Sequence, residues 1–177
     1  MSFLAKTVKR TFKDQTIDCS QVQFSDIQTI DLKQLQQLFD STAFWAQSRS
    51  LEDLSLALKH SNPVISAWHN GDLIGFARAT SDWVYRATIW DVVVDSKYQG
   101  AGIGRKLIHT LLSHPAVAKV ERVYLMTTQQ QEFYKRIGFE VNPSTTMLLL
   151  NQPAVVTPAA EFASQVMSFP PSTVLAD

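Results

Sequence analysis

The sequence is poor in residues that form disulfides or bind metals. Its 177 residues include one cysteine, Cys19, and four histidines. A single cysteine forms no disulfide within the chain, and no group of cysteine and histidine has the spacing of a zinc site. We therefore expect no bound metal, and the cysteine content fits a reducing compartment.

Long apolar runs and a surplus of either charge are also absent. No stretch approaches the roughly 18–20 apolar residues that cross a bilayer, and the basic start "MSFLAKTVKRTFK" lacks the apolar centre of a signal peptide. Lys+Arg and Asp+Glu are both 16, so a broad basic surface for nucleic acid is not expected. These absences predict a cytoplasmic protein without a membrane or nucleic-acid partner. Between Lys97 and Arg136, however, seven basic residues accompany two acidic ones, which either attracts an anionic ligand or forms a solvated helix face.

Glycine is scarce, and its placement is uneven. Three of the six glycines, Gly100, Gly102 and Gly104, fall in "QGAGIG" between two apolar segments. Glycine costs stability unless the backbone needs a conformation that other residues rarely adopt. This stretch is therefore either a ligand-binding loop or a glycine-rich turn without a ligand.

Hydrophobic periodicity divides the chain into strands and helices. It predicts a weak strand at 16–25, helices at 32–39 and 51–58, a hairpin around Asn70-Gly71, a strand at 88–94, a helix at 103–112, a strand at 120–127, a short helix ending at Gly138 and a strand at 145–150. Asp31 and Ser50 are the expected N-caps of the first two helices.

The order of these elements predicts an α/β fold with a mixed sheet. The strand–helix–strand sequence over 88–127 requires a parallel crossover, whereas the Asn-Gly hairpin requires antiparallel neighbours. Four of the seven prolines fall after residue 151. We therefore expect one domain at 1–151 and a proline-containing tail at 152–177, flexible or draped over the domain.

The spacing of the glycines argues against two common phosphate-binding loops. The P-loop needs Gly-Lys followed by Ser or Thr, but Gly104 is followed by Arg105. The dinucleotide fingerprint is G-x-G-x-x-G in the first strand–helix turn of a parallel sheet. Here the spacing is G-x-G-x-G near the middle of the chain, which makes that interpretation poor.

Two stretches together resemble a known family. "QGAGIGR" (99–105) and "EFYKRIGFE" (132–140) are similar to the signatures of the GNAT superfamily of N-acetyltransferases, and the resemblance covers roughly residues 15–150. The stretch at 79–104 resembles the plastid and cyanobacterial branch related to plant serotonin N-acetyltransferases, which adds the plastid stroma as a location. The family implies a mixed, mostly antiparallel sheet of six to seven strands, with the parallel crossover and helices on both faces.

The resemblance also implies where acetyl-CoA, the cosubstrate, is held. The strand backbone would pair with the pantetheine arm, a bulge amide within 91–93 would polarise the thioester oxygen, and the loop amides would bind the pyrophosphate. The implied cofactor-binding residues are Val92, Val93, Val94, Gln99, Gly100, Ala101, Gly102, Ile103, Gly104, Arg105, Thr127, Phe133 and Tyr134. Lys106 is a weaker candidate for a charged contact.

Two side chains are the candidates for catalysis. Tyr134 would hydrogen-bond the departing sulfur or pass it a proton. Asp91 is either the general base for the amine or a buried carboxylate that satisfies local hydrogen bonds. Thr127 stands where the family often has Asn or Asp, and threonine is a poor base.

The sequence therefore predicts an acetyl-CoA-dependent N-acetyltransferase that uses direct transfer in a ternary complex. The acceptor would be an arylalkylamine such as serotonin, or a lysine or N-terminal amine of a protein. Phe44, Trp45 and residues 142–147 are the candidates for the acceptor pocket. The protein is expected as a monomer or homodimer, and the alternative is a non-catalytic acyl-CoA-binding regulatory module on the same fold.

Overall fold

The computed structural model describes residues 9–12, 15–18, 21–144 and 146–149. The chain divides into two compact units, residues 1–139 and 140–177. All helices and strands of the described residues lie in the first unit. The tail expected at 152–177 and Cys19 both lie outside the described residues.

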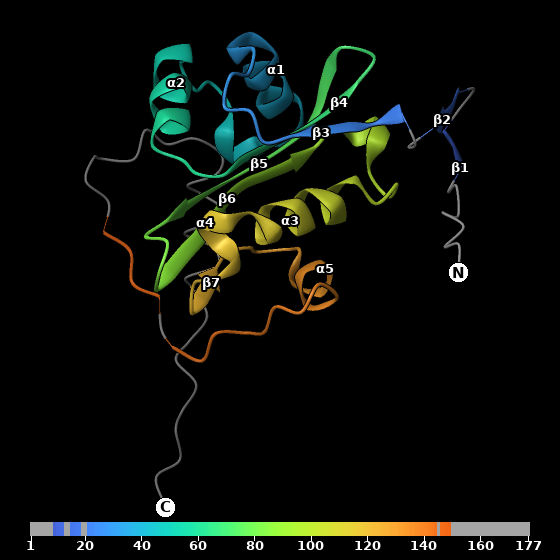
Figure 1. The fold of residues 1–177 in the computed structure, drawn as a ribbon. Coiled ribbons are helices and arrows are strands. Elements are labelled where there is room, and N and C mark those ends of the chain that lie inside the picture. Colours follow the sequence, from blue (N-terminus) through green and yellow to red (C-terminus); the bar gives the residue numbers. More distant parts are fainter. Residues whose placement is uncertain (1–8, 13–14, 19–20, 145, 150–177) are drawn as a thin grey trace, which may run out of the picture. The chain divides into compact units, whose positions relative to one another are not determined.

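A five-stranded sheet forms the centre of the first unit (Figure 1). In spatial order its strands are β3 (Gln23–Ser25), β4 (Val64–His69), β5 (Asp72–Ser81), β6 (Arg86–Val94) and β7 (Arg122–Tyr124). Strands β3 to β6 pair antiparallel, whereas β6 and β7 are parallel. A separate two-stranded sheet pairs β1 (Lys9–Phe12) with β2 (Gln15–Asp18). The predicted mixed α/β fold with a parallel crossover is confirmed.

The strand count and several strand boundaries differ from the prediction. Within the described residues the central sheet has five strands instead of six to seven. The weak strand at 16–25 is divided between β2 and β3, and the strand at 120–127 shortens to the three residues of β7. Residues 146–149 form no strand, and Met147 is 92% exposed. Because strand propensity acts through packing against neighbouring strands, an apolar run that pairs with none of the described strands stays irregular.

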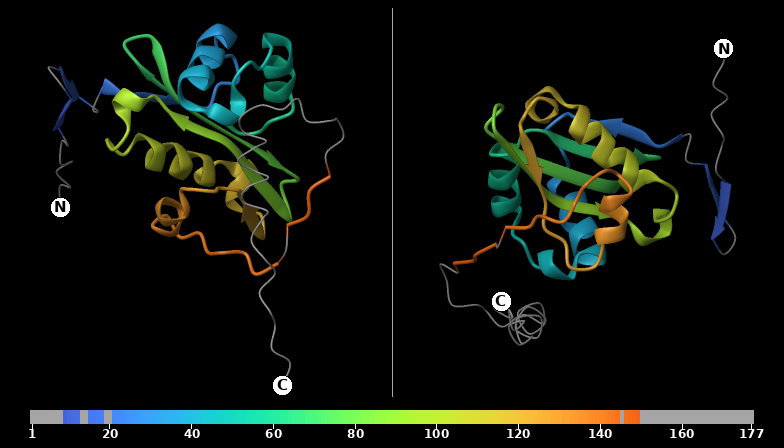
Figure 2. Two further views of the ribbon diagram at one scale, coloured as in Figure 1. Left: turned by 180° about the vertical axis from the view of Figure 1, so that it is seen from behind. Right: turned by 90° about the horizontal axis from the view of Figure 1, so that it is seen from below.

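Helices cover both faces of the central sheet (Figure 2). They are α1 (Leu32–Thr42), η2 (Phe44–Ala46), α2 (Leu51–Lys59), η3 (Ser96–Tyr98), α3 (Ile103–Ser113), α4 (Pro115–Ala118) and α5 (Gln131–Lys135). Helices α1 and α2 bury one face around Phe39 and Phe76. Helix α3 buries the other face around Leu107 and Leu111, where side chains of α5 join it.

Local sequence signals set several element boundaries. Asp31 and Ser50 accept hydrogen bonds from first-turn backbone N–H groups of α1 and α2, which confirms both predicted N-caps. Asn70 and Gly71 connect β4 to β5 with φ angles of 53° and 88°, the left-handed pair of a tight hairpin turn. These signals succeed because each depends on a few adjacent residues.

Candidate functional site

Strand β6 contains the bulge that the resemblance implied. Phe76 faces Val93 and Arg78 faces Trp90 across the β5–β6 ladder. The single residue between them on β5 therefore faces two residues on β6, Asp91 and Val92. Asp91 has φ 54°, a left-handed conformation that costs a non-glycine residue roughly 1–2 kcal/mol. A bulge redirects the backbone groups of its strand, so the N–H groups after Asp91 depart from the regular ladder.

Strands β6 and β7 pair over a short distance only. Residues 86–88 face residues 122–124, and from residue 89 to 94 β6 continues beside β5 alone. Within the described residues, this edge of β6 has no strand neighbour over its second half. An extended ligand can add to such an edge as a further strand does.

The glycine loop begins where this open edge ends. Gly100 and Gly102 have φ angles of 75° and 85°, which favour glycine because other residues rarely adopt them. Gly102 is the N-cap of α3 and supplies no capping side chain, and the first turn carries no acidic residue. The loop therefore ends on a helix N-terminus whose backbone N–H groups and dipole favour an anion.

Side chains before the loop hold its start in place. Asp95 Oδ1 accepts a hydrogen bond from the Lys97 backbone N–H at 2.8 Å, and Gln99 Nε2 donates to the Val94 carbonyl at 3.0 Å. The Tyr98 hydroxyl lies 3.0 Å from His69 Nδ1 at the end of β4. The loop is thus tied both to its own strand and to the neighbouring hairpin.

Gly104 lies where β6, α3 and α5 meet. A Cβ atom at this position would lie 3.7 Å from Val94 Cγ2 and 3.6 Å from Phe133 Cζ, both ordinary contact distances. The φ angle of Gly104 is outside the left-handed region. The fold thus requires glycine at 100 and 102 but not at 104. Val94, Gly104 and Phe133 therefore lie close to one another.

Tyr134 lies on α5 within a small aromatic cluster. Its ring makes edge contacts with Phe133 at 4.9 Å and Phe139 at 5.8 Å between centroids. Burial raises the pKa of the Tyr134 hydroxyl to about 12. Among the described residues no buried side-chain N or O atom lacks a hydrogen-bond partner, and the Tyr134 hydroxyl makes no hydrogen bond to another described residue, so it reaches the surface. It is a protonated donor at neutral pH.

Two other predicted cofactor residues make contacts within the protein. Thr127 Oγ1 accepts a hydrogen bond from the Gln130 backbone N–H at 3.1 Å, which braces the turn before α5. Arg105 Nη2 donates to the Arg136 carbonyl at 3.3 Å. The Lys106 ammonium lies 4.7 Å from the ring centroid of Phe24, on the side of α3 that faces β3.

Asp91 is engaged by two arginines. Its Oδ2 lies 2.6 Å from Arg78 Nε and 3.2 Å from Arg49 Nη1, and its side chain is 7% exposed. Arg49 packs on rings of α1 and η2, so this cluster lies on the α1–α2 side. Val92 and Val94 instead pack against the core on the α3 side, as Tyr134 does. The structure therefore separates the two predicted catalytic side chains between the two faces of the sheet.

Sequence reasoning missed Arg78 and Arg49. Arg78 stands between Ala77 and Ala79 in "GFARAT", a charged residue inside an apolar strand. An arginine in such a place needs a buried partner, and that was the available signal. Arg49 lies in a polar stretch, so no local pattern marked it.

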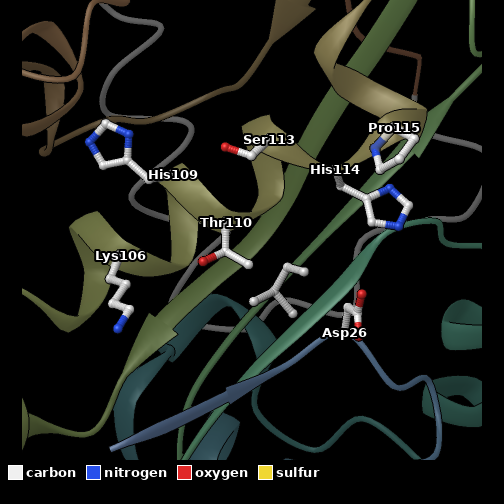
Figure 3. Close-up of a pocket in the computed structure, with 8 residues that line it drawn as sticks. Asp26, Lys106, His109, Thr110, Ser113, His114 and Pro115 are labelled. Atoms are coloured by element: carbon white, nitrogen blue, oxygen red, sulfur yellow. The ribbon is translucent and has the colours of Figure 1, made fainter. Parts of the chain in front are cut away.

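A separate hollow of about 500 Å³ lies along α3 (Figure 3). Its lining consists of Asp26, Ile65, Lys106, His109, Thr110, Ser113, His114 and Pro115. His109 and His114 lie at opposite ends of the view in Figure 3, and His114 Nδ1 accepts a hydrogen bond from the Ala116 backbone N–H. None of the predicted catalytic residues lines this hollow.

Within the residues that the structure describes, no three side chains gather as metal ligands, and no helix has the length and hydropathy needed to cross a membrane.

Comparison with known proteins agrees with this geometry. The sequence model of the Acetyltransferase (GNAT) family matches residues 29–139. The uncharacterized N-acetyltransferase ycf52 of Pyropia yezoensis is 38% identical over an alignment of 135 residues that covers 71% of this chain and 76% of that protein. Histone acetyltransferase TAP1 of Glycine max is 39% identical over an alignment of 148 residues that covers 77% of this chain and 62% of the longer soybean protein.

Solved structures share the fold. A GNAT family acetyltransferase from Streptococcus pneumoniae superposes with a TM-score of 0.64 at 23% identity, over 75% of this chain and 99% of that one. At this identity the likeness concerns the fold alone.

Proposed function

Because the chain belongs to the GNAT family of acetyltransferases, we propose that it transfers the acetyl group of acetyl-CoA to a primary amine. One observation carries the proposal: an open, bulged strand edge leads directly into a glycine loop at an uncapped helix N-terminus. A long ligand with an anionic group at one end fits this arrangement, because the edge offers backbone pairing and the loop offers N–H groups.

Each segment of the site would hold a different part of acetyl-CoA. The backbone of Val92, Val93 and Val94 would pair with the pantetheine amides. The N–H groups of residues 99–105 would bind the pyrophosphate, and the Arg105 guanidinium would add a charge-assisted contact. Gly104 leaves room for about one methyl group beside Val94 and Phe133, and the chain of the cosubstrate would lie against this surface.

During acetyl transfer, negative charge develops on the carbonyl oxygen when the amine attacks and on the sulfur when the C–S bond breaks. The site therefore needs a hydrogen-bond donor at each of these atoms. The amine nitrogen attacks the thioester carbon, the C–S bond breaks, and the amine proton ends on the sulfur of CoA. A bulge N–H at Val92 or Val93 would hydrogen-bond the carbonyl oxygen as it gains charge. The Tyr134 hydroxyl would hydrogen-bond the departing sulfur.

The pKa of Tyr134 decides between two forms of that assistance. A thiol has a pKa of about 8.5, whereas burial raises that of Tyr134 to about 12. Because the pKa of Tyr134 exceeds that of a thiol by more than three, full proton transfer from Tyr134 to a thiolate is unfavourable. We infer that Tyr134 stabilises the thiolate as a hydrogen-bond donor, while the proton itself derives from the amine.

The proton acceptor for the amine remains a prediction from sequence. The sequence predicts Asp91 as the candidate, but its Oδ2 is paired with the guanidinium groups of Arg78 and Arg49. A proton taken up on Oδ2 would break both charge-assisted bonds. Solvent water is the simpler acceptor for an ammonium that must be neutral before it attacks.

The acceptor class is the finer part of the proposal. Trp45 and Phe44 are exposed on the α1–α2 side, which suits an arylalkylamine or an amine on a protein side chain or N-terminus. The soybean relative is named a histone acetyltransferase, which supports a protein lysine. By resemblance to the plastid and cyanobacterial branch, we propose a plastid stroma or cyanobacterial cytoplasm as the location.

An acceptor panel tests the proposed function. Arylalkylamines, polyamines, lysine peptides and N-terminal peptides are each incubated with acetyl-CoA, and release of free CoA is measured. Turnover with one class is expected. Calorimetric binding of acetyl-CoA without turnover on any acceptor would favour the non-catalytic acyl-CoA-binding module, and absence of binding would refute both functions.

A further inference from the structure

The ion-pair cluster of Asp91, Arg78 and Arg49 lies at the bulge itself. Asp91 combines a left-handed backbone with a carboxylate that is 7% exposed. A strained backbone persists only when its surroundings hold it. Here the surroundings are two guanidinium groups that converge on one carboxylate oxygen.

Arg78 is itself fixed by several partners. Its Nη1 donates to Ser61 Oγ at 3.0 Å, and its guanidinium lies 6.0 Å from the ring centroid of Trp90. Trp90 Nε1 in turn donates to Thr80 Oγ1 at 2.9 Å. The guanidinium thus approaches Asp91 from a position set by β5, β6 and the end of α2.

Arg49 reaches the same carboxylate from the segment between η2 and α2. Its guanidinium lies 5.2 Å and 5.6 Å from the ring centroids of Phe39 and Trp45. Its backbone carbonyl accepts a hydrogen bond from Gln36 Nε2 at 2.7 Å. Arg49 therefore connects α1 and η2 to the bulge, and its side chain remains 33% exposed.

We propose that Asp91 is a positioning residue, held by Arg78 and Arg49, that fixes the bulge and so aims the Val92 and Val93 N–H groups at the thioester oxygen. The inference rests on the proposed acetyl transfer for its kinetic consequence. The carboxylate acts on its own backbone: while both arginines hold Oδ2, the Asp91 main chain cannot return to the regular strand conformation. Arg78 and Arg49 act through Asp91 and touch no reacting atom.

This assignment and a general-base role for Asp91 predict different kinetics. A base works in its free form, so removal of a neighbouring cation would move the acid limb of the rate profile to higher pH. Loss of a positioning residue lowers the rate by the same factor at every pH at which the carboxylate stays ionised, because the misplaced groups are backbone N–H groups that do not titrate. Misplacement by about 1 Å can cost on the order of 100-fold in rate.

The test compares kcat and KM for Asp91→Asn, Arg78→Gln, Arg78→Lys and Arg49→Gln from about pH 6 to about pH 10. We expect Asp91→Asn and Arg78→Gln to lower kcat about 10- to 100-fold, with the pH profile unchanged in shape and KM for acetyl-CoA changed little. Arg78→Lys should recover part of the loss, because an ammonium still pairs with the carboxylate. Arg86→Gln is the matched control, since Arg86 pairs with Glu121 on the surface at the start of β6.

Two results would overturn the inference. One is an acid limb that disappears in Asp91→Asn or moves to higher pH in Arg78→Gln, which identifies a base. The other is a folded Arg49→Gln or Arg78→Gln protein with kcat within about twofold of wild type. Arg49→Gln keeps the test decisive if the buried substitutions prevent folding, because Arg49 is partly exposed.

A second readout does not depend on turnover. The backbone amide resonances of Val92 and Val93 are compared among wild type, Arg49→Gln and Arg86→Gln without any ligand. If the Val92 and Val93 resonances shift more in Arg49→Gln than in Arg86→Gln, the result supports the positioning network. If they do not shift, the network is refuted. An inactive wild-type protein with displaced resonances would refute the proposed function and leave the positioning network standing.

Discussion

The functional value of single residues in this protein depends on their burial more than on their type. Tyr134 is an ordinary tyrosine in sequence, but burial raises the pKa of its hydroxyl to about 12. Asp91 is an ordinary aspartate in sequence, but its carboxylate forms ion pairs with two arginines. The sequence predicted both positions as candidates, and only the packing around them distinguishes the proposed hydrogen-bond donor from the proposed positioning residue.

Substitution of Tyr134 by phenylalanine removes the hydroxyl and keeps the ring. We expect kcat to fall about 100-fold, in the usual range for loss of one positioned hydrogen-bond donor to a developing negative charge, while acetyl-CoA affinity stays within about twofold. Steady-state kinetics and calorimetry measure the two quantities. Tyr85→Phe on the exposed β5–β6 turn is the control, and an unchanged kcat in Tyr134→Phe would remove this residue from the mechanism.

The raised pKa of Tyr134 also predicts a change of stability in alkaline solution. Unfolded tyrosine has a pKa of about 10, so above this pH the unfolded state loses the proton while the folded state keeps it. The stability that burial of the neutral hydroxyl contributes is complete below pH 10 and is lost as pH rises towards 12. The free energy of unfolding, measured with denaturant, should therefore fall more steeply with rising pH in wild type than in Tyr134→Phe. Parallel curves for the two proteins would contradict the raised pKa of Tyr134.

At the scale of elements, two glycines of the loop serve different purposes, one in folding and the other in the proposed binding. Gly102 needs its left-handed backbone to begin α3, whereas a methyl group at Gly104 meets only ordinary contacts. Gly104→Ala should leave the melting temperature within about 2 °C and weaken acetyl-CoA binding at least about tenfold, because the methyl fills the space beside Val94 and Phe133. Thermal unfolding and calorimetry measure both.

The contrasting change is Gly102→Ala. It should destabilise the protein by about 1 kcal/mol or more, because alanine is strained in the left-handed region. Gly71→Ala in the hairpin is its control, with a similar backbone cost and full acetyl-CoA affinity. Equal loss of binding in Gly71→Ala and Gly104→Ala would refute a specific role of the loop.

Elements differ in how well the sequence predicted them, and the reason is the range of the interactions. Helices α1 and α2 begin at the predicted caps, Asp31 and Ser50, because a cap involves only neighbouring residues. The apolar run at 145–150 has strand-like composition, but its described residues form no strand. A strand depends on a partner far away in sequence, which no local pattern supplies.

At the scale of the whole molecule, the proposed acetyl-CoA site depends on the short pairing of the parallel strands β6 and β7. Binding of acetyl-CoA along the open half of β6 should slow amide hydrogen exchange at Val92–Val94 and in residues 100–105. Exchange in the hairpin at Asn70-Gly71 should not change, because that turn lies outside the site. Exchange measured by mass spectrometry with and without acetyl-CoA tests this, and protection confined to the hollow along α3 would move the binding site there.

The sequence by itself determined the α/β class, the hairpin, the helix starts and the glycine loop, because each follows from local periodicity, caps or turn chemistry. It also marked Val92–Val94, Tyr134 and Asp91 as candidates through family resemblance. Only the tertiary structure decided that β6 pairs with β7 over three residues, that Gly104 is free of backbone strain, and that Arg78 and Arg49 hold Asp91. These features depend on contacts between segments distant in the chain, where burial and charge pairing are fixed by packing.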